Sequence, residues 1–125
     1  MRVLLDTHIF LWFLNGDKRL TSRALKHIDA ADEVYVSAAS VWEAAIKSGL
    51  GKLDAQAAVL AAEITSVGFL ELPVRAAHSI ALQNLPLWHR DPFDRMLLAQ
   101  AISESLQLLT ADVQLRRYSP LVLRA

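Results

Sequence analysis

The sequence predicts an α/β fold, a three-layer α/β/α sandwich in which helices cover both faces of a mostly parallel sheet of four to five strands. Short apolar runs alternate along the chain with longer segments of helical periodicity, which is typical of strand-helix-strand units. The 125 residues are 54% hydrophobic and 21% charged, so the chain holds enough apolar material for one core. No linker, repeat or low-complexity tract interrupts it, and we expect residues 1–125 to form a single domain.

The expected strands are the short apolar runs, and the segments between them repeat apolar side chains at helical spacing. The strands are expected at residues 3–5, 34–36, 69–72, 106–109 and 121–123. The helices are expected at residues 8–14, 21–30, 38–47, 55–66, 75–83, 92–105 and 113–117. Gly49, Gly51 and Gly68 are expected to end two of these helices, and Asp91-Pro92 provides an N-cap followed by a proline at the first helical position.

The charge balance and the lack of cysteine exclude several classes of protein. Lys and Arg total 13 and Asp and Glu total 13, so no broad cationic surface is expected and any polyanion must be held locally. Without cysteine there is no disulfide, thiolate zinc site or cysteine nucleophile, which agrees with a reducing, cytoplasmic location. Asp6 and His8 interrupt the apolar start of the chain, and no other stretch approaches a membrane span, so we expect a soluble protein with no membrane partner.

Four acidic residues stand within or directly after apolar segments, where an isolated carboxylate is costly to bury. Asp6 and Asp112 follow the first and fourth expected strands, at the edge where open α/β sheets bind ligands. Glu43 and Asp94 share helical faces with apolar residues and are expected to point toward the sheet. If the first and fourth strands are neighbours, these four carboxylates converge as oxygen ligands suited to Mg²⁺ or Mn²⁺.

Each of these acids also fits an ordinary local role. Asp6 and Asp112 fit helix caps, and Asp94 fits the first turn of a helix, where a negative charge complements the helix dipole. Glu43 precedes Lys47 by four residues and fits a simple ion pair on a helix surface. Only the joint pattern favours a shared site, because capping alone requires neither the apolar phasing of two acids nor the strand-end position of the other two.

Four segments occur in a fixed order between Val3 and Asp112: LLDTHIFLWFL, SAASVWEAAIKSGLGKL, HRDPFDRMLLAQA and LLTAD. They resemble the motifs of the PIN-domain nucleases, and specifically the small VapC-like toxins of toxin-antitoxin pairs. The resemblance implies that the four acids are the family's acidic quartet and that Thr7 and Thr110 are the hydroxyl positions beside it. His8 departs from the pattern, because many relatives have Asn or Ser at that position.

The resemblance further implies a metal-dependent endoribonuclease that inhibits growth by cleaving cellular RNA, with a cognate antitoxin protein as partner and a homodimer as the common assembly. One or two Mg²⁺ or Mn²⁺ ions held by carboxylates can activate water and stabilise the attacking and leaving oxygens of a phosphodiester displacement. We expect Asp6 and Asp94 to be the principal ligands and Asp112 to bind directly or through water. Glu43 is expected to orient or deprotonate the attacking water, and Asp91 to be a helix cap first and an outer ligand second.

Other polar residues give weaker signals. The candidate phosphate contacts are Arg90, Arg95, Lys47, Lys52 and Arg116. The histidines at positions 27, 78 and 89 lack the spacing of metal ligands, so ordinary structural or surface roles are expected for them. Residues 9–14 are apolar on every face, which predicts either deep burial or contact with a second chain, and in the resembling toxins this region helps to form the antitoxin groove.

Three alternatives remain open from the sequence. A PIN-type RNA-processing nuclease would share the same site, and a non-catalytic PIN-like binding module would be expected to lack one or more of the four acids, all of which are present. A phosphotransfer receiver would have an acid pair directly after the first strand and a lysine after the fifth. The chain has Asp6-Thr7-His8 in the first place and no lysine after Lys52.

Overall fold

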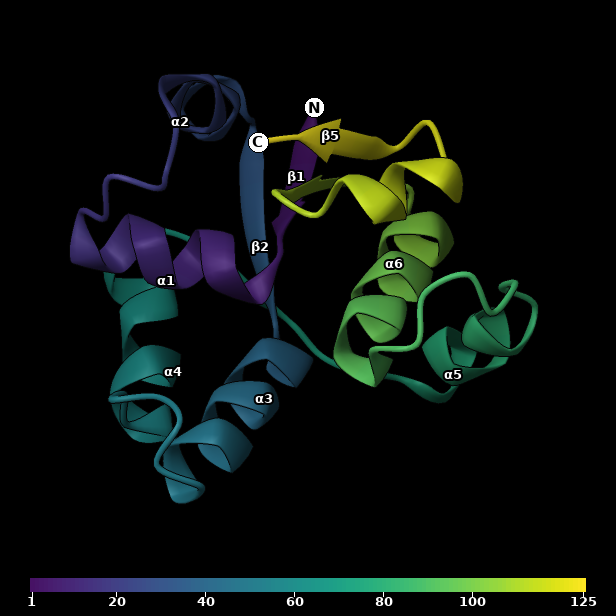
Figure 1. Cartoon of the computed structure of the whole chain (residues 1–125). Coiled ribbons are helices and arrows are strands. Elements are labelled where there is room, and N and C mark those ends of the chain that lie inside the picture. The colour runs from purple at the N-terminus through teal and green to yellow at the C-terminus, as the bar shows by residue number, and fades with distance from the viewer.

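Five parallel strands run through the centre of the computed structural model, which describes residues 1–125 (Figure 1). The strands are β1 (Arg2–Leu5), β2 (Glu33–Ser37), β3 (Leu70–Leu72), β4 (Gln107–Thr110) and β5 (Val122–Arg124). Their order in the sheet is β3-β2-β1-β4-β5, so the first and fourth strands are neighbours at its middle. This adjacency is the condition that the sequence left open for the acids to converge.

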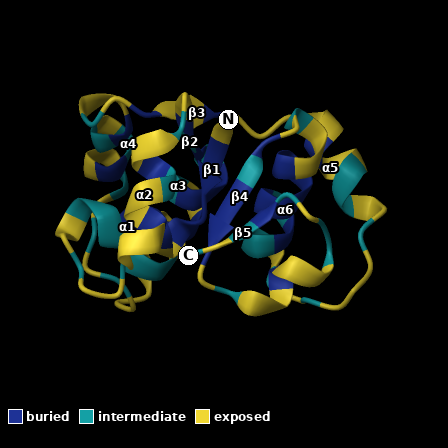
Figure 2. Ribbon diagram, turned by 90° about the horizontal axis from the view of Figure 1, so that it is seen from above, coloured by how far each residue is buried: buried dark blue, intermediate teal, exposed yellow.

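The helices lie on both sides of the sheet (Figures 1 and 2). They are α1 (Thr7–Asn15), α2 (Ser22–Ala30), α3 (Ala38–Gly49), α4 (Ala57–Ser66), α5 (Ala76–Gln83), α6 (Pro92–Glu104) and the 3₁₀ helix η1 (Val113–Arg117). Every expected strand and helix is present with bounds within two residues of the expectation, and the sheet is entirely parallel. None of the helices has the length and apolar character that a membrane crossing requires.

Alternation along the strands creates two cores, because successive side chains point to opposite faces of a sheet. Val3 and Leu5 of β1 pack into a cluster with α1, α2 and α4, whereas Leu4 between them packs into a second cluster with α6 and η1. The three inner strands, β1, β2 and β4, are accordingly mostly buried (Figure 2). Burial on both faces leaves the carboxyl edge of the sheet as the place where polar side chains can gather.

The apolar first helix is covered largely by its own chain. Its residues 9–11 are buried, and residues 12–14 are partly buried against the cluster that α1 shares with α2 and α4. The Phe13 ring lies 5.1 Å from that of Phe69, between centroids. Of the two possibilities that the sequence allowed, burial accounts for residues 9–11, whereas contact of residues 12–14 with a second chain stays a prediction. The exposed large apolar side chains lie elsewhere, with Trp42, Leu50, Ile80, Leu87 and Val113 the most exposed.

Candidate active site

Asp6 lies at the base of the site, directly after β1 and against the end of β4. Its backbone N–H donates to the carbonyl of Leu109 at 3.0 Å, which continues the pairing of the two strands by one residue. One carboxylate oxygen caps α1 by accepting from the N–H of Ile9 at 2.9 Å, and the other accepts from the hydroxyl of Thr110. Burial raises the pKa of the Asp6 carboxyl, and the bonds from Thr110 and Ile9 offset that rise only in part.

Asp94 enters the site from the first turn of α6. The helix is started by Asp91, whose carboxylate accepts from the N–H of Phe93 at 2.9 Å and from that of Asp94 at 3.0 Å, with Pro92 following as the first helical residue. Burial raises the pKa of the Asp94 carboxyl to about 7, with further contributions from the negative charges of Asp91 and Asp6. The structure therefore makes Asp91 the helix cap, as expected, and gives Asp94 a carboxyl that is costly to ionise without a cation.

Asp112 follows β4 and faces the same space. Its backbone N–H donates to the hydroxyl of Thr110 at 3.0 Å, so this threonine bonds both to Asp112 and to Asp6. One oxygen of Asp112 caps η1 by accepting from the N–H of Gln114 at 2.9 Å, and the other lies 2.8 Å from Nε2 of His89.

His89 is the residue of the site that sequence reasoning missed. Its Nε2 lies 2.8 Å from Asp112 Oδ2 and 3.3 Å from Asp94 Oδ2, and the ligand atoms of these three residues all fall within 4.8 Å of one another. The N–H of Asp91 donates to its Nδ1 at 3.1 Å, so the neutral ring carries its proton on Nε2 and donates toward the acids. The only sequence signal was its position two residues before Asp91. The sequence predicted an ordinary structural or surface role for His89 and gave no indication of its contacts with two of the acids.

Glu43 reaches the site from α3 and is 3% exposed. Its Oε2 accepts from Nζ of Lys47 at 2.6 Å, whereas its Oε1 is buried without any hydrogen-bond partner. The charge of Glu43 contributes to the raised pKa values of both Asp6 and Asp94, which places it on the same cluster. Thr7 links α1 to α3, because its hydroxyl donates to the hydroxyl of Ser40 on α3 at 2.9 Å.

The candidate phosphate contacts separate into three groups. Arg95 is buried and its guanidinium donates to backbone carbonyls, among them those of Pro86 at 2.7 Å and His89 at 3.3 Å, so its expected contact with phosphate was wrong. It holds the segment between α5 and α6 instead. Lys47 is partly buried, and its ammonium group is engaged by the carboxylate of Glu43. The side chains at positions 52, 90 and 116 are exposed and form no ion pair.

The donors of the cluster fit a hard divalent cation. The four acids supply carboxylate oxygens, the ligands that Mg²⁺ and Mn²⁺ prefer. Burial is the main cause of the raised pKa values of Asp6 and Asp94, and the charges of neighbouring acids add to it, so a bound cation would favour the ionised forms. Three of the acids also make the local contacts that the sequence predicted, since Asp6 and Asp112 cap helices and Glu43 pairs with Lys47.

Two hollows open at this edge of the sheet. One, of about 400 Å³, has Asp94 and Asp112 on one side and residues of α1 and the following turn on the other; it is lined by Asp6, His8, Trp12, Arg19, Asp94, Ala111 and Asp112. The second, of about 270 Å³, is lined by Thr7, His8, Leu11, Glu43, Ala44, Lys47, Lys52 and Leu53. His8 borders both hollows, so the position that departs from the family pattern lies at the entrance to the acids.

The order of the parallel strands and the acidic residues that follow β1 and β4 together indicate the class of protein to which this chain belongs. The family model of the PIN domain matches residues 3–120, and the chain belongs to this family. It is 33% identical over 122 residues to Ribonuclease VapC22 of Mycobacterium tuberculosis, an alignment that covers 93% of this chain and 91% of that protein.

Solved structures share the fold at lower sequence identity. The VapBC2 complex of Rickettsia felis, bound to a DNA fragment from its promoter, contains a chain that aligns with a TM-score of 0.70 at 16% identity, covering 100% of this chain and 98% of that one. A toxin-antitoxin complex from Klebsiella pneumoniae aligns with a TM-score of 0.66 at 16% identity, covering 97% and 95%. The FitAcB structure from Neisseria gonorrhoeae aligns with a TM-score of 0.62 at 21% identity, covering 90% and 89%.

Proposed function

We propose that this protein is a metal-dependent endoribonuclease and the toxin of a toxin-antitoxin pair, which inhibits growth by cleaving cellular RNA. The observation that carries the proposal is the convergence of three carboxylates, Asp6, Asp94 and Asp112, on one cleft. Glu43 lines the adjoining hollow, and its charge acts on both Asp6 and Asp94. Membership of the PIN family supports a nuclease, and the ribonuclease name of the relative from M. tuberculosis supports RNA as the substrate.

Asp6, Asp94 and Asp112 are the residues that would hold one or two Mg²⁺ or Mn²⁺ ions. A bound divalent cation supplies a more acidic water and stabilises the developing charge on the attacking and leaving oxygens. Thr110 keeps two of these acids in place by its bonds to Asp6 and Asp112. Glu43 has one oxygen fixed by Lys47 and one oxygen free, which suits it to orient a water or to accept its proton.

His89 is assigned a positioning role rather than a place among the metal ligands. Its Nδ1 accepts from the N–H of Asp91, so the proton remains on Nε2 and that nitrogen has no lone pair to offer a cation. Its N–H instead fixes Asp112, as hydrogen-bond donors around metal-bound carboxylates commonly do.

The test of the activity compares purified wild-type protein with the Asp6→Asn variant on single-stranded RNA and on DNA of the same sequence. We expect cleavage of RNA with Mg²⁺ or Mn²⁺, none with excess EDTA, and none by the variant. Expression of both proteins in growing cells, followed by mapping of cleaved RNA ends, tests the role as a toxin. Activity that persists in EDTA would refute the metal mechanism, and cleavage of purified RNA without growth arrest would favour an RNA-processing nuclease.

The proposal includes a cognate antitoxin, a homodimer and a cytoplasmic location. The R. felis and K. pneumoniae structures that share the fold are toxin-antitoxin complexes, which supports an antitoxin partner. A homodimer is consistent with the exposed apolar side chains on α3 and around α5 and α6, where Trp42, Val74, Pro92 and Met96 border an apolar hollow of about 390 Å³. Sedimentation of the wild type and of Trp42→Glu tests the dimer, since a monomer in both would exclude it.

A further inference from the structure

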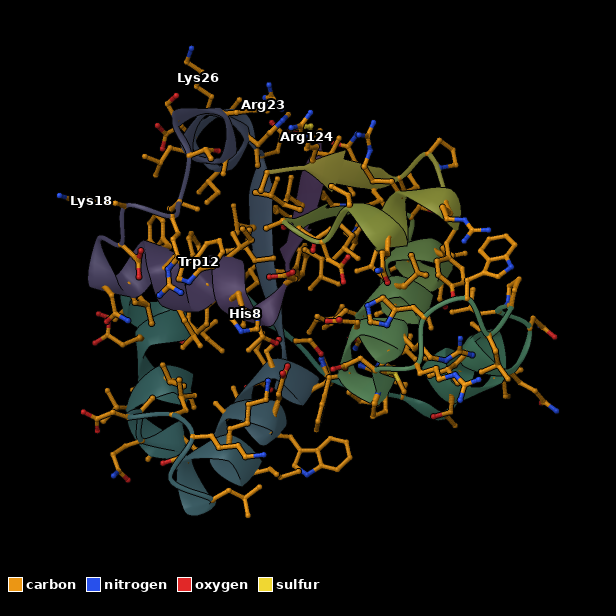
Figure 3. The ribbon with its side chains drawn as sticks, viewed as in Figure 1. His8, Trp12, Lys18, Arg23, Lys26 and Arg124 are labelled. Carbon is orange, nitrogen blue, oxygen red and sulfur yellow. The ribbon has the colours of Figure 1, made fainter.

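We propose that single-stranded RNA leaves the active site along α1 and that its phosphates bind a cationic surface around α2. This surface, the α2 cationic face, is defined by Lys18, Arg23, Lys26 and Arg124 (Figure 3). The inference rests on the proposed ribonuclease function and adds to it the path of the substrate, along cations that were not among the phosphate contacts expected from the sequence.

The four cations of this face are free to bind an external anion. All four side chains are exposed, and none of them forms an ion pair with an acid of the chain. Asp17 is occupied by Arg19 at 2.8 Å, and Asp32 by the N-terminal amine, so these two nearby acids do not neutralise them. Asp29 on α2 is exposed and offsets one of the four charges, which still leaves a local excess of positive charge on this side of a chain of zero net charge.

The face is connected to the acids through both the sheet and α1. Arg124 is in register with Thr110 across β4 and β5, and the hydroxyl of Thr110 donates to Asp6. His8 and Trp12 line the acidic cleft from the α1 side, and Figure 3 shows them on α1 with the four cations farther out, around α2 and the C-terminal end. A strand that passes over α1 therefore reaches phosphate-binding groups after leaving the acids.

The wall of the cleft between the acids and this face is suited to nucleotide bases. The rings of His8 and Trp12 lie 6.1 Å apart between centroids, and the Arg19 guanidinium lies 5.1 Å from the centroid of Trp12. Aromatic rings and guanidinium planes stack on bases regardless of sequence. Arg19 is already neutralised by Asp17, so its contribution is the flat stacked surface, whereas the charge comes from the four unpaired cations.

The side of the cleft away from α1 offers fewer free cations for phosphate. Arg95 on that side is buried among carbonyls and Lys47 is paired with Glu43, which removes two of the expected contacts. Arg117 covers the ring of Trp88 at 4.6 Å from its centroid. Arg90 and Arg116 remain exposed there and were expected as phosphate contacts, so the matched control uses Arg75 and Arg117, which are exposed and line neither hollow.

The test measures RNA binding by the full chain in the Asp6→Asn background, where RNA is not cleaved. Arg23→Glu with Lys26→Glu is compared with Arg75→Glu with Arg117→Glu, which makes the same change of charge away from both hollows. Loss of two phosphate contacts should lower the slope of log Kd against log salt by about 1.4 and weaken binding about 25-fold at 0.1 M salt. The control pair should leave both quantities within about twofold, and equal thermal midpoints exclude unfolding.

The length of the substrate provides an independent measurement. In the active background, the α2 variant should lose cleavage of a long RNA but keep wild-type cleavage of an oligonucleotide too short to leave the cleft. Arg23→Gln with Lys26→Gln serves the same purpose if the reversed charges unfold α2. Wild-type binding in the α2 variants, or a larger loss in the control pair, would overturn the inference.

Two further outcomes separate this inference from its alternatives. Loss of binding to the antitoxin with no loss of RNA binding would overturn it by making the face a protein interface. Absence of RNA cleavage by the wild type would instead refute the proposed function, whatever the α2 variants do.

Discussion

Replacing Asp94 with asparagine should stabilise the metal-free protein at neutral and alkaline pH. The folded-state pKa of Asp94 is raised from 3.8 to about 7, chiefly by burial. Below pH 4 the carboxyl is protonated in both the folded and the unfolded chain, so it costs nothing. As the pH rises from about 4 to 7, the unfolded chain ionises more readily than the folded one, and the wild type loses stability that the asparagine variant keeps.

The size of this effect follows from the pKa. Each tenfold change in the acid dissociation constant corresponds to about 1.4 kcal/mol, so the full rise is worth about 4 kcal/mol. The Asp94 side chain is 24% exposed, and solvent screening reduces the expected gain to about 2 kcal/mol. For a chain of this length that is about 6 to 10 °C in the thermal midpoint. The amide oxygen of the introduced asparagine preserves an acceptor for His89, so the shape of the site is kept.

Calorimetry between pH 4 and 8 in EDTA measures the difference in stability between the wild type and the asparagine variant. The same measurement with Mn²⁺ tests their response to metal. A cation that binds only the folded wild type at a hundred times its Kd adds about 2.7 kcal/mol, and the asparagine variant should lose this response. Asp17→Asn is the control of opposite sign, because the bonds from Arg19 lower the pKa of the Asp17 carboxyl to about 2 and the loss of this carboxylate should slightly destabilise the fold. Marked destabilisation by Asp94→Asn at pH 8 without metal would show that this carboxylate is a structural partner.

The remaining predictions concern residues around the acids. Asp91→Asn should keep activity and cost about 0.5 to 2 kcal/mol or less as a helix cap, so a loss of turnover equal to that of Asp94→Asn in a well-folded protein would make Asp91 a ligand. His89→Ala should weaken Mn²⁺ binding about 10- to 100-fold by calorimetry, and His89→Gln, which retains a donor, should restore part of it; tighter binding in the alanine variant would mean that the imidazole competes with the cation. Arg95→Met should lower the free energy of unfolding by about 1 to 3 kcal/mol, because it leaves the carbonyls of Leu85 and His89 without the guanidinium donor; unchanged stability with weakened RNA binding would return Arg95 to the substrate.

The fold was predictable because the hydrophobic periodicity of each segment and the residues at its ends agree along the whole chain. Alternating apolar strands and amphipathic helices predicted every element, and the position of Asp6 and Asp112 after two strands predicted the edge where they meet. The order of strands was not readable from these patterns, because parallel strands joined by helices have no local pairing signal. The adjacency of β1 and β4 therefore came from the structure alone.

Where the sequence did not predict the site correctly or completely, the reason is the direction in which a side chain points, which only packing determines. Arg95 follows Asp94 directly, yet neighbours on a helix point about 100° apart, so one faces the cleft while the other faces the segment between α5 and α6. His89 reaches the acids from a loop, where no periodicity specifies direction, through bonds from the N–H of Asp91 and to the hydroxyl of Tyr118. For the apolar first helix, the sequence could not decide between burial and contact with a second chain, because it does not show which elements pack on that helix. In the structure, α2 and α4 pack on it.

The order of strands has a consequence for the synthesis of the protein. β4 occupies a central position in the sheet beside β1, although it is among the last segments to be translated. The bond between Thr110 and Asp6 joins residues 104 positions apart in the chain. Until β4 leaves the ribosome, the middle of the sheet is open and Asp112 has no place beside Asp94. The acidic cluster therefore cannot assemble before the chain has been translated past Asp112 and β4 has paired with β1, and a nascent chain that stops short of this point has no complete site.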